Sequence, residues 1–247
     1  MTLRTVTAGV SFDGARRLSR PAVEALLLAA LYLAGELARG LARGGQATAD
    51  AHAADIVRLE RRLHVFDEAT VQRAAHHVAG LPAFLGYAYV SLHLAATVTV
   101  LFWVYLRRRH AYERLRNTFA VASALAVVGY ALFPTAPPRL AGIGIGDTVS
   151  AATSVNLDSS LVSSLYNPYA AVPSMHIGFS LLVAVAVVRL AHRPLWRLAG
   201  ALYPVFVLFM IVATGNHFFV DAAAGALVAG LAAAAVALVS SRRHEFG

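Results

Sequence analysis

The chain alternates long apolar runs with shorter polar segments that carry most of its charge. The longer runs match the ~20 apolar residues that an α-helix needs to cross a bilayer, and the others fall a little short of it. Proline, glycine or arginine stands at the ends of most runs, as is common at helix ends. The pattern predicts an all-α integral membrane protein, a six-helix bundle with spans at residues 21–38, 82–106, 118–133, 172–190, 195–213 and 217–239.

The segment between the first two predicted spans has a different pattern. Apolar side chains recur there at helical spacing, at Ile56, Leu59, Leu63 and Phe66. Charged side chains, among them Glu60, are expected to cover the other faces. This pattern predicts an amphipathic helix lying on the membrane surface. We therefore divide the chain into residues 1–81, with the first span and the interfacial helices, and a transmembrane core at residues 82–247.

Composition supports this class and excludes several kinds of chemistry. Of the 247 residues, 58% are apolar and 14% are charged, whereas soluble domains are usually about 25% charged. Cysteine is absent, which excludes disulfides, a thiolate nucleophile and a cysteine metal site. All 21 basic residues are arginine, which excludes a P-loop lysine and Schiff-base chemistry. In so apolar a chain, membrane topology and anionic lipids explain the net charge of +8 better than nucleic acid does.

The arginines predict the orientation of the chain. They cluster at 107–116, 189–197 and 242–243, which all fall on one side of the predicted membrane. By the positive-inside rule this side is the cytoplasm, so both termini are expected there, in a plasma or inner membrane. The opposite, extracytoplasmic face then receives a group of polar residues: Arg139, Ser174, His176, His217 and Asp221.

His217 and Asp221 stand four residues apart at the seam between two apolar runs. On a helix this spacing places them on one face, one turn apart. Asp221 can then accept a hydrogen bond from one ring nitrogen of His217. That bond fixes the tautomer and leaves the other nitrogen free to act as a base, a ligand or a nucleophile.

Three further residues of this face suit the binding of phosphate. Arg139 is a permanent cation whose planar fork matches phosphate oxygens. Ser174 lies where a helix begins, beside unpaired N–H groups and the positive end of the helix dipole. His176 follows two residues later. With His217 this set suits phosphoryl transfer, in which one histidine attacks phosphorus and the other protonates the leaving oxygen.

Other functions remain open at this stage. Two histidines and an aspartate could hold zinc, although the chain has no HExxH pair. Haem between His93 and another span histidine is conceivable but has no motif behind it. Proton or ion transport predicts acidic residues near mid-span, where Glu24 is a poor candidate. We favour phosphoryl transfer over metal binding, and metal binding over transport.

At these residues the chain resembles the type 2 phosphatidic acid phosphatase superfamily, over roughly residues 82–240. The resemblance lies in the block Pro173-Ser174-Met175-His176 and in the later block from His217 to Asp221, with Arg139 as the upstream arginine. It implies a nucleophilic His217 supported by Asp221, and His176 as general acid. It also implies phosphate contacts from Arg139 and Ser174, and neither a metal nor another cofactor.

The chain also departs from the common phosphatase pattern. That pattern has a lysine before the first arginine, a proline where Leu140 stands and an arginine where Ile211 stands. Asn216, Thr214 and backbone N–H groups could replace the lost cations at the phosphate. The blocks around Arg139 and His217 look more like those of inositol phosphorylceramide synthases, which transfer a phospho-headgroup between lipids.

From this resemblance we expect a lipid phosphate substrate and an alcohol or polyol acceptor. The glycine- and serine-rich loop at 142–167 and the amphipathic segment are the candidates for the acceptor site. The alternative is a phosphatase that hydrolyses phosphatidic acid or polyprenyl phosphates. The oligomeric state does not follow from the sequence.

Overall fold

A computed structural model of the chain describes residues 45–157 and 167–245, together with scattered positions between 23 and 35. Most of the predicted first span, residues 21–38, therefore lies outside the described residues. Every regular element of the described part is a helix. All the elements discussed below belong to one unit, residues 35–247.

Four helices of the described part are long and apolar enough to cross a membrane. The first is the continuous run Leu81–Arg107, which consists of α4 (Leu81–Tyr87), the π-helical turn η1 (Ala88–Leu92) and α5 (His93–Arg107). The others are α6 (Arg109–Leu132), α10 (Pro194–Ala213) and α11 (Phe219–Glu245). These helices confirm an all-α membrane protein, and each overlaps a span predicted from the apolar pattern.

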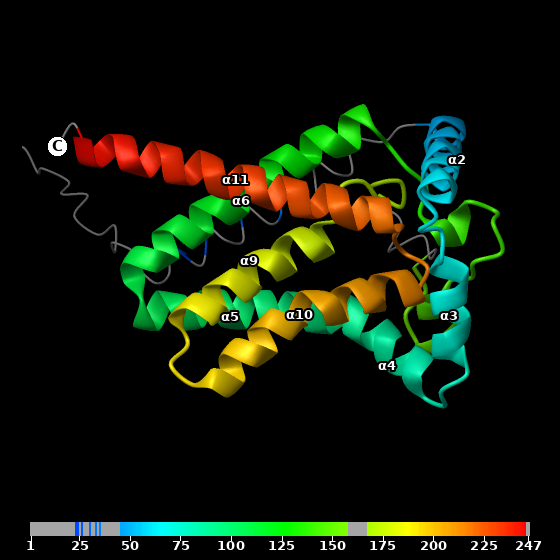
Figure 1. Ribbon diagram of the computed structural model, residues 1–247, viewed down its shortest axis with the longest axis horizontal. Coiled ribbons are helices and arrows are strands. Elements are labelled where there is room, and N and C mark those ends of the chain that lie inside the picture. Colours follow the sequence, from blue (N-terminus) through cyan, green and yellow to red (C-terminus); the bar gives the residue numbers. More distant parts are fainter. Residues whose placement is uncertain are drawn as a thin grey trace, which may run out of the picture. The chain divides into compact units, whose positions relative to one another are not determined.

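Helix α9 (Met175–Leu190) is the central helix of the bundle (Figure 1). It packs against α5, α6, α10 and α11. Its 16 residues extend about 24 Å, which is less than the ~30 Å hydrocarbon core of a bilayer. The predicted span at 172–190 is therefore too long at its beginning, because α9 begins only after Ser174. The count of six spans stays a prediction.

The outer faces of the bundle carry large apolar side chains. Phe102, Leu132, Val205 and Leu231 each expose more than half of their surface. Large apolar side chains exposed on α5, α6, α10 and α11 fit contact with lipid. Helix α6 begins at Arg109 rather than at 118, because the arginine-rich segment before the apolar run continues the same helix.

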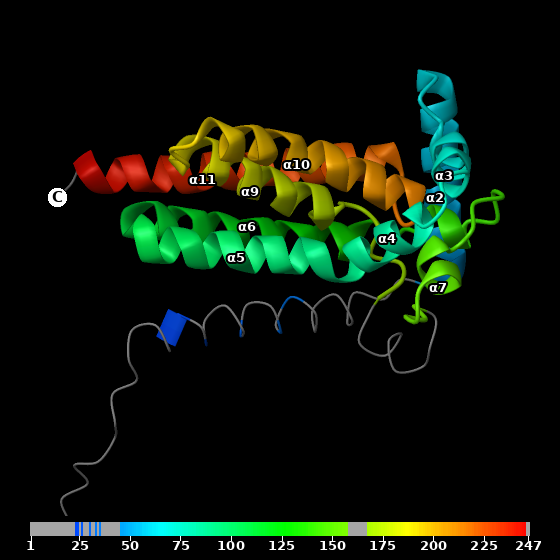
Figure 2. The ribbon, with the colours of Figure 1, turned by 90° about the horizontal axis from the view of Figure 1, so that it is seen from below.

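Helices α2 (Gln46–Leu63) and α3 (Glu68–His76) lie across one end of the bundle, near the start of α11 (Figure 2). The buried face of α2 consists of Ala49, Ala53, Ile56, Val57 and Glu60. Of the predicted apolar stripe, Ile56 is buried and Phe66 is half-buried, whereas Leu59 and Leu63 are exposed, so the placement of this face on a membrane surface stays a prediction. Small side chains at 49 and 53 allow a close backbone approach, in which the Ala136 N–H donates to the Ala49 carbonyl at 3.1 Å.

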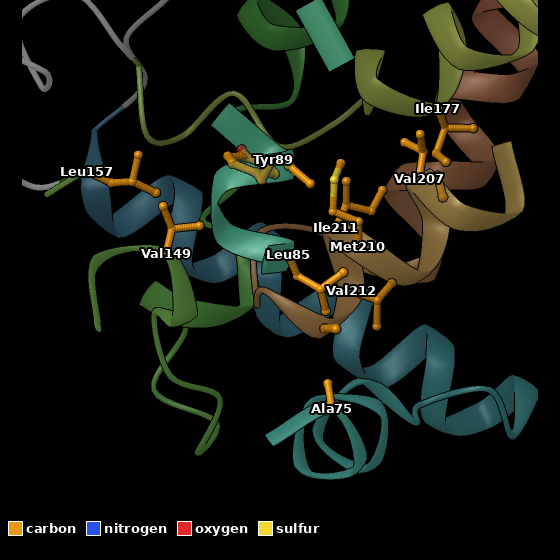
Figure 3. Close-up of a cluster of buried hydrophobic side chains, with 13 residues drawn as sticks. Ala75, Leu85, Tyr89, Val149, Leu157, Ile177, Val207, Met210, Ile211 and Val212 are labelled. Atoms are coloured by element: carbon orange, nitrogen blue, oxygen red, sulfur yellow. The ribbon is translucent and has the colours of Figure 1, made fainter. Parts of the chain in front are cut away.

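A cluster of buried apolar side chains joins this end of the bundle to the loop that follows α6 (Figure 3). It includes Ala75 of α3, Leu85 of α4, Val212 of α10 and Val149 of the short helix α7 (Thr148–Ala152). Gln72 of α3 fixes the same loop, because its side chain both donates to the Gly146 carbonyl and accepts from the Gly146 N–H. Part of the loop at 142–167 is thus packed and helical.

Candidate active site

The turn between α10 and α11 is set by a positive-φ glycine. Gly215 has φ of 74°, a conformation that glycine adopts without strain. Its N–H donates to the Val212 carbonyl, and the Asn216 N–H donates to the Ile211 carbonyl. These two bonds form a Schellman motif, which ends α10 and turns the chain. His217 follows directly after this turn.

His217 and Asp221 are paired, but not in the way that helical spacing predicts. Helix α11 begins at Phe219, so His217 lies before the helix and only Asp221 lies within its first turn. Asp221 Oδ2 accepts a hydrogen bond from Nδ1 of His217 at 3.2 Å and from the Phe218 N–H at 2.9 Å. Both side chains are buried. Because Nδ1 carries the proton toward Asp221, Nε2 keeps its lone pair for reaction.

The two sequence blocks meet at the start of α9. The Ser174 N–H donates to the Asp221 carbonyl at 3.0 Å, and the ring of His176 lies 5.5 Å from that of His217, edge to face. Ser174 occupies the N-cap position of α9, yet its buried Oγ has no hydrogen-bond partner among the described residues. A buried hydroxyl and the first N–H groups of a helix together suit an anion.

Arg139 reaches this region from η2 (Pro138–Leu140). Its backbone N–H donates to the Gly215 carbonyl at 2.9 Å, which ties the proline-rich loop to the turn before His217. Its Nε donates to Oδ1 of Asn216 at 3.2 Å, and its Nη1 lies 3.3 Å from Oδ2 of Asp147. Arg139 is the only buried arginine in the described part of the chain.

Asn216, a predicted phosphate contact, is held by neighbouring protein groups. Its Nδ2 donates to Oγ1 of Thr214 at 3.0 Å and to the Thr214 carbonyl at 3.3 Å. Its Oδ1 accepts from Arg139. The Asn216 amide therefore orients the guanidinium of Arg139. We expect Asn216 to influence phosphate binding through that guanidinium. Ile211, at the position of a phosphatase arginine, is fully buried in the apolar cluster and supplies no cation.

Two further aromatic residues contact His176, and the sequence patterns did not single them out for this role. Tyr89 stacks on the His176 ring with centroids 4.6 Å apart, and the ring of His93 lies 4.8 Å away. Both come from the stretch around η1, and π-helical turns are frequent at functional sites. The only signal for them in the sequence was a histidine inside an apolar span.

Glu60 and Glu68 are also at this end of the bundle and were missed. The expectation that Glu60 lies on the polar face of its helix is wrong, because both glutamates are fully buried. Glu60 follows Ala53, Ile56 and Val57 at helical spacing, so it belongs to the buried stripe. That spacing was the signal that could have found it.

The zinc alternative predicts a cluster of ligating side chains. Across residues 45–157 and 167–245, no three His, Asp or Glu side chains are grouped so that they could hold a metal ion. Asp221 instead hydrogen-bonds to His217 and to the start of α11. The geometry therefore fits an oriented histidine better than a metal ligand set.

Comparison with known proteins agrees with this geometry. A family model described as the PAP2 superfamily matches residues 54–235, well over half of the chain. The chain therefore belongs to the PAP2 superfamily, and its apolar helices make it a membrane member. It is a phosphatase-like enzyme of lipid phosphates, in a superfamily that contains phosphatases and phosphotransferases. Searches of curated proteins and of solved structures gave no match.

Proposed function

We propose that the protein transfers a phospho-headgroup between a lipid and an alcohol acceptor, through a phosphohistidine on His217. The observation that carries this proposal is the pairing of His217 Nδ1 with Asp221 beside His176 and the start of α9. The pairing leaves Nε2 of His217 as a nucleophile with a fixed orientation. His176 is then the acid that gives a proton to the leaving oxygen and the base that takes one from the acceptor.

The reaction has two displacement steps at phosphorus. In the first, Nε2 of His217 forms a bond to phosphorus, the bond from phosphorus to the leaving oxygen breaks, and protonated His176 gives its proton to that oxygen. In the second, the acceptor hydroxyl gives its proton to His176 and attacks phosphorus, and the bond to Nε2 breaks. Arg139, the Ser174 hydroxyl and the first N–H groups of α9 stabilise the charge on the non-bridging oxygens.

The charge of the site supports a phosphodiester substrate over a monoester. Arg139 is ion-paired with Asp147 at 3.3 Å, and Ile211 stands where phosphatases carry a second arginine. A phosphate monoester carries a charge of about −1.5 to −2 at neutral pH, whereas a diester carries one negative charge. Arg139, the one permanent cation at this site in the described part of the chain, is partly neutralised, which matches the diester. Phosphodiester donors are the substrates of headgroup transfer.

The two elements that are candidates for binding the acceptor contact each other near the site. An acceptor must be bound close to His217 and shielded from water if it is to compete with hydrolysis. Gln72 of α3 joins the amphipathic segment to the loop after α6, through Gly146 and Oγ1 of Thr148. The two candidate acceptor elements therefore adjoin each other at the end of the bundle that holds His217.

The proposal is tested with purified enzyme and a phospholipid whose phosphorus is radioactive. We expect the label to move to the acceptor when inositol or a long-chain alcohol is added, with the yield rising with acceptor concentration. His217→Ala is the control and should give no labelled product. If the label appears only in hydrolysis products at every acceptor concentration, as free phosphate or as a phosphorylated headgroup, transfer is rejected and a hydrolase remains.

We also propose that the site faces the extracytoplasmic side, with both termini in the cytoplasm. The α5–α6 and α9–α10 connections lie at the end of the bundle away from α2 and α3 (Figure 1). Nη2 of Arg108 lies 2.7 Å from Nε2 of His192, which joins these two arginine-rich connections. Positive charge at one end and the site at the other support this orientation.

A single cysteine tests the orientation, because the natural chain has none. We expect His110→Cys to react with an impermeant thiol reagent only after the membrane is opened. The matched variant Ser154→Cys, at an exposed position of the loop at the other end, should react in intact cells or right-side-out vesicles. Labelling of position 110 from outside would reverse the orientation.

A further inference from the structure

The first turn of α11 is capped by residues far away in the sequence. The first N–H groups of a helix have no partner within the helix, and Phe218, just before α11, has no side chain that can cap them. Glu68 Oε1 accepts from the Phe219 N–H at 3.3 Å, and Glu60 Oε1 accepts from the Val220 N–H at 2.8 Å. Asp221 Oδ2 accepts from the Phe218 N–H, just before the helix.

The two glutamates form an acid pair. Both are fully buried, and Oε2 of each has no partner as a carboxylate among the described residues. Two buried negative charges side by side would be strongly unfavourable. Burial, together with the hydrogen bond to Glu68 and the nearby charges of Glu68 and Asp221, raises the pKa of Glu60 to about 9. At neutral pH Glu60 is therefore a neutral acid that donates to Glu68.

We infer that Glu60 and Glu68 are positioning residues, which hold the first turn of α11 and through it the reactive His217–Asp221 pair. The inference rests on the proposed role of His217. These two glutamates thereby act on the reaction through α11. The two acids supply a cap that the sequence of α11 lacks, and one shared proton makes this cap compatible with burial beside Asp221.

The shared proton makes the cap sensitive to pH in a defined direction. The pKa of Glu60 in the folded protein, about 9, lies above its ordinary value of 4.5. Between these values the folded protein holds a proton that the unfolded chain has released, so this contribution to stability declines as pH rises. Above about pH 9 the pair becomes two carboxylates that face Asp221, and the first turn of α11 should loosen.

Hydrogen exchange at residues 218–221 tests the cap independently of activity. Glu60→Gln keeps an acceptor for Val220 and a donor for Glu68, so exchange at neutral pH should match the wild type. Glu60→Ala should speed exchange there by about 10-fold or more, because the N–H groups lose their partner. Between pH 8 and 10, wild-type protection should fall relative to Glu60→Gln. The exposed Glu113→Gln is the matched control and should behave like the wild type.

Kinetics then link the cap to the reaction. We expect Glu60→Ala to lower kcat about 100-fold with little change in KM, and Glu60→Gln to restore kcat. If Glu60→Ala does not fold, the comparison of exchange at residues 218–221 between Glu60→Gln and the wild type, as the pH rises, still tests the inference. Wild-type exchange and wild-type kcat in a folded Glu60→Ala protein, or equal exchange in Glu60→Gln and the wild type up to pH 10, would overturn the inference. Turnover by His217→Ala would instead overturn the proposed function while leaving the cap intact.

Discussion

Replacing His217 with alanine is expected to abolish turnover while the protein stays folded. The attacking nitrogen belongs to this ring, and removal of the ring leaves Asp221 still hydrogen-bonded to the Phe218 N–H. Asp221→Asn should lower kcat by about 10⁴-fold, the effect seen when the carboxylate partner of another catalytic histidine is neutralised. The amide can donate to Nδ1 and so favours the wrong tautomer. Rates are measured on the radioactive phospholipid, with thermal unfolding as the check on folding.

Controls separate this result from a general loss of structure. His110→Ala removes an exposed histidine away from the site and should keep full activity. EDTA should leave the wild-type rate unchanged, because the chemistry proposed for His217 and His176 needs no metal. A folded His217→Ala protein that turns over substrate, or an EDTA-sensitive enzyme restored by zinc, would contradict the histidine mechanism.

Replacing Gly225 with alanine is expected to lower kcat by about 100-fold, because α11 presses on the start of α9 at this glycine. A Cβ at position 225 would lie 2.0 Å from the Ser174 carbonyl oxygen and 2.9 Å from its carbon. That carbonyl accepts the Gly178 N–H in the first turn of α9. Backbone cannot move aside as a side chain can, so the two helices must separate. Ser174 and His176 would then shift relative to His217.

Gly230→Ala is the matched control in the same helix. A Cβ there would meet no described atom within 4 Å, and alanine favours the helix over glycine by up to ~1 kcal/mol. We expect Gly230→Ala to keep its activity and its unfolding temperature, or to raise the latter. Full activity in Gly225→Ala would show that the contact between α9 and α11 tolerates movement and does not set the site.

The features of the fold that depend on composition along the chain were predictable. Apolar runs long enough to cross a bilayer lead to α10 almost residue by residue and to most of α11, because a span in lipid must satisfy its own backbone hydrogen bonds. That His217 hydrogen-bonds to Asp221 followed from their spacing, although His217 does not lie on the helix that this spacing assumed. The start of α11 did not, since the Schellman turn at Gly215 continues past His217 and delays the helix to Phe219.

The parts that escaped prediction depend on contacts between distant segments. Glu60 looks like a surface residue beside three arginines, and only the packing of α2 against Phe218 and Ala136 turns it inward. The stacking of Tyr89 on His176 likewise depends on where η1 passes α9. Such contacts carry no local pattern, so the sequence alone could single out the two candidate histidines but not Glu60 or Tyr89, which depend on them.

The most direct test of the central claim is to trap the covalent intermediate. Enzyme mixed with phospholipid labelled at phosphorus is quenched in alkali within milliseconds to seconds, and its peptides are analysed by mass spectrometry. We predict a label that is stable to alkali, labile to acid, located on His217, absent from His217→Ala and removed when the acceptor alcohol is added before the quench. A label on another residue, or turnover with no trapped label in either protein, would contradict the phosphohistidine mechanism.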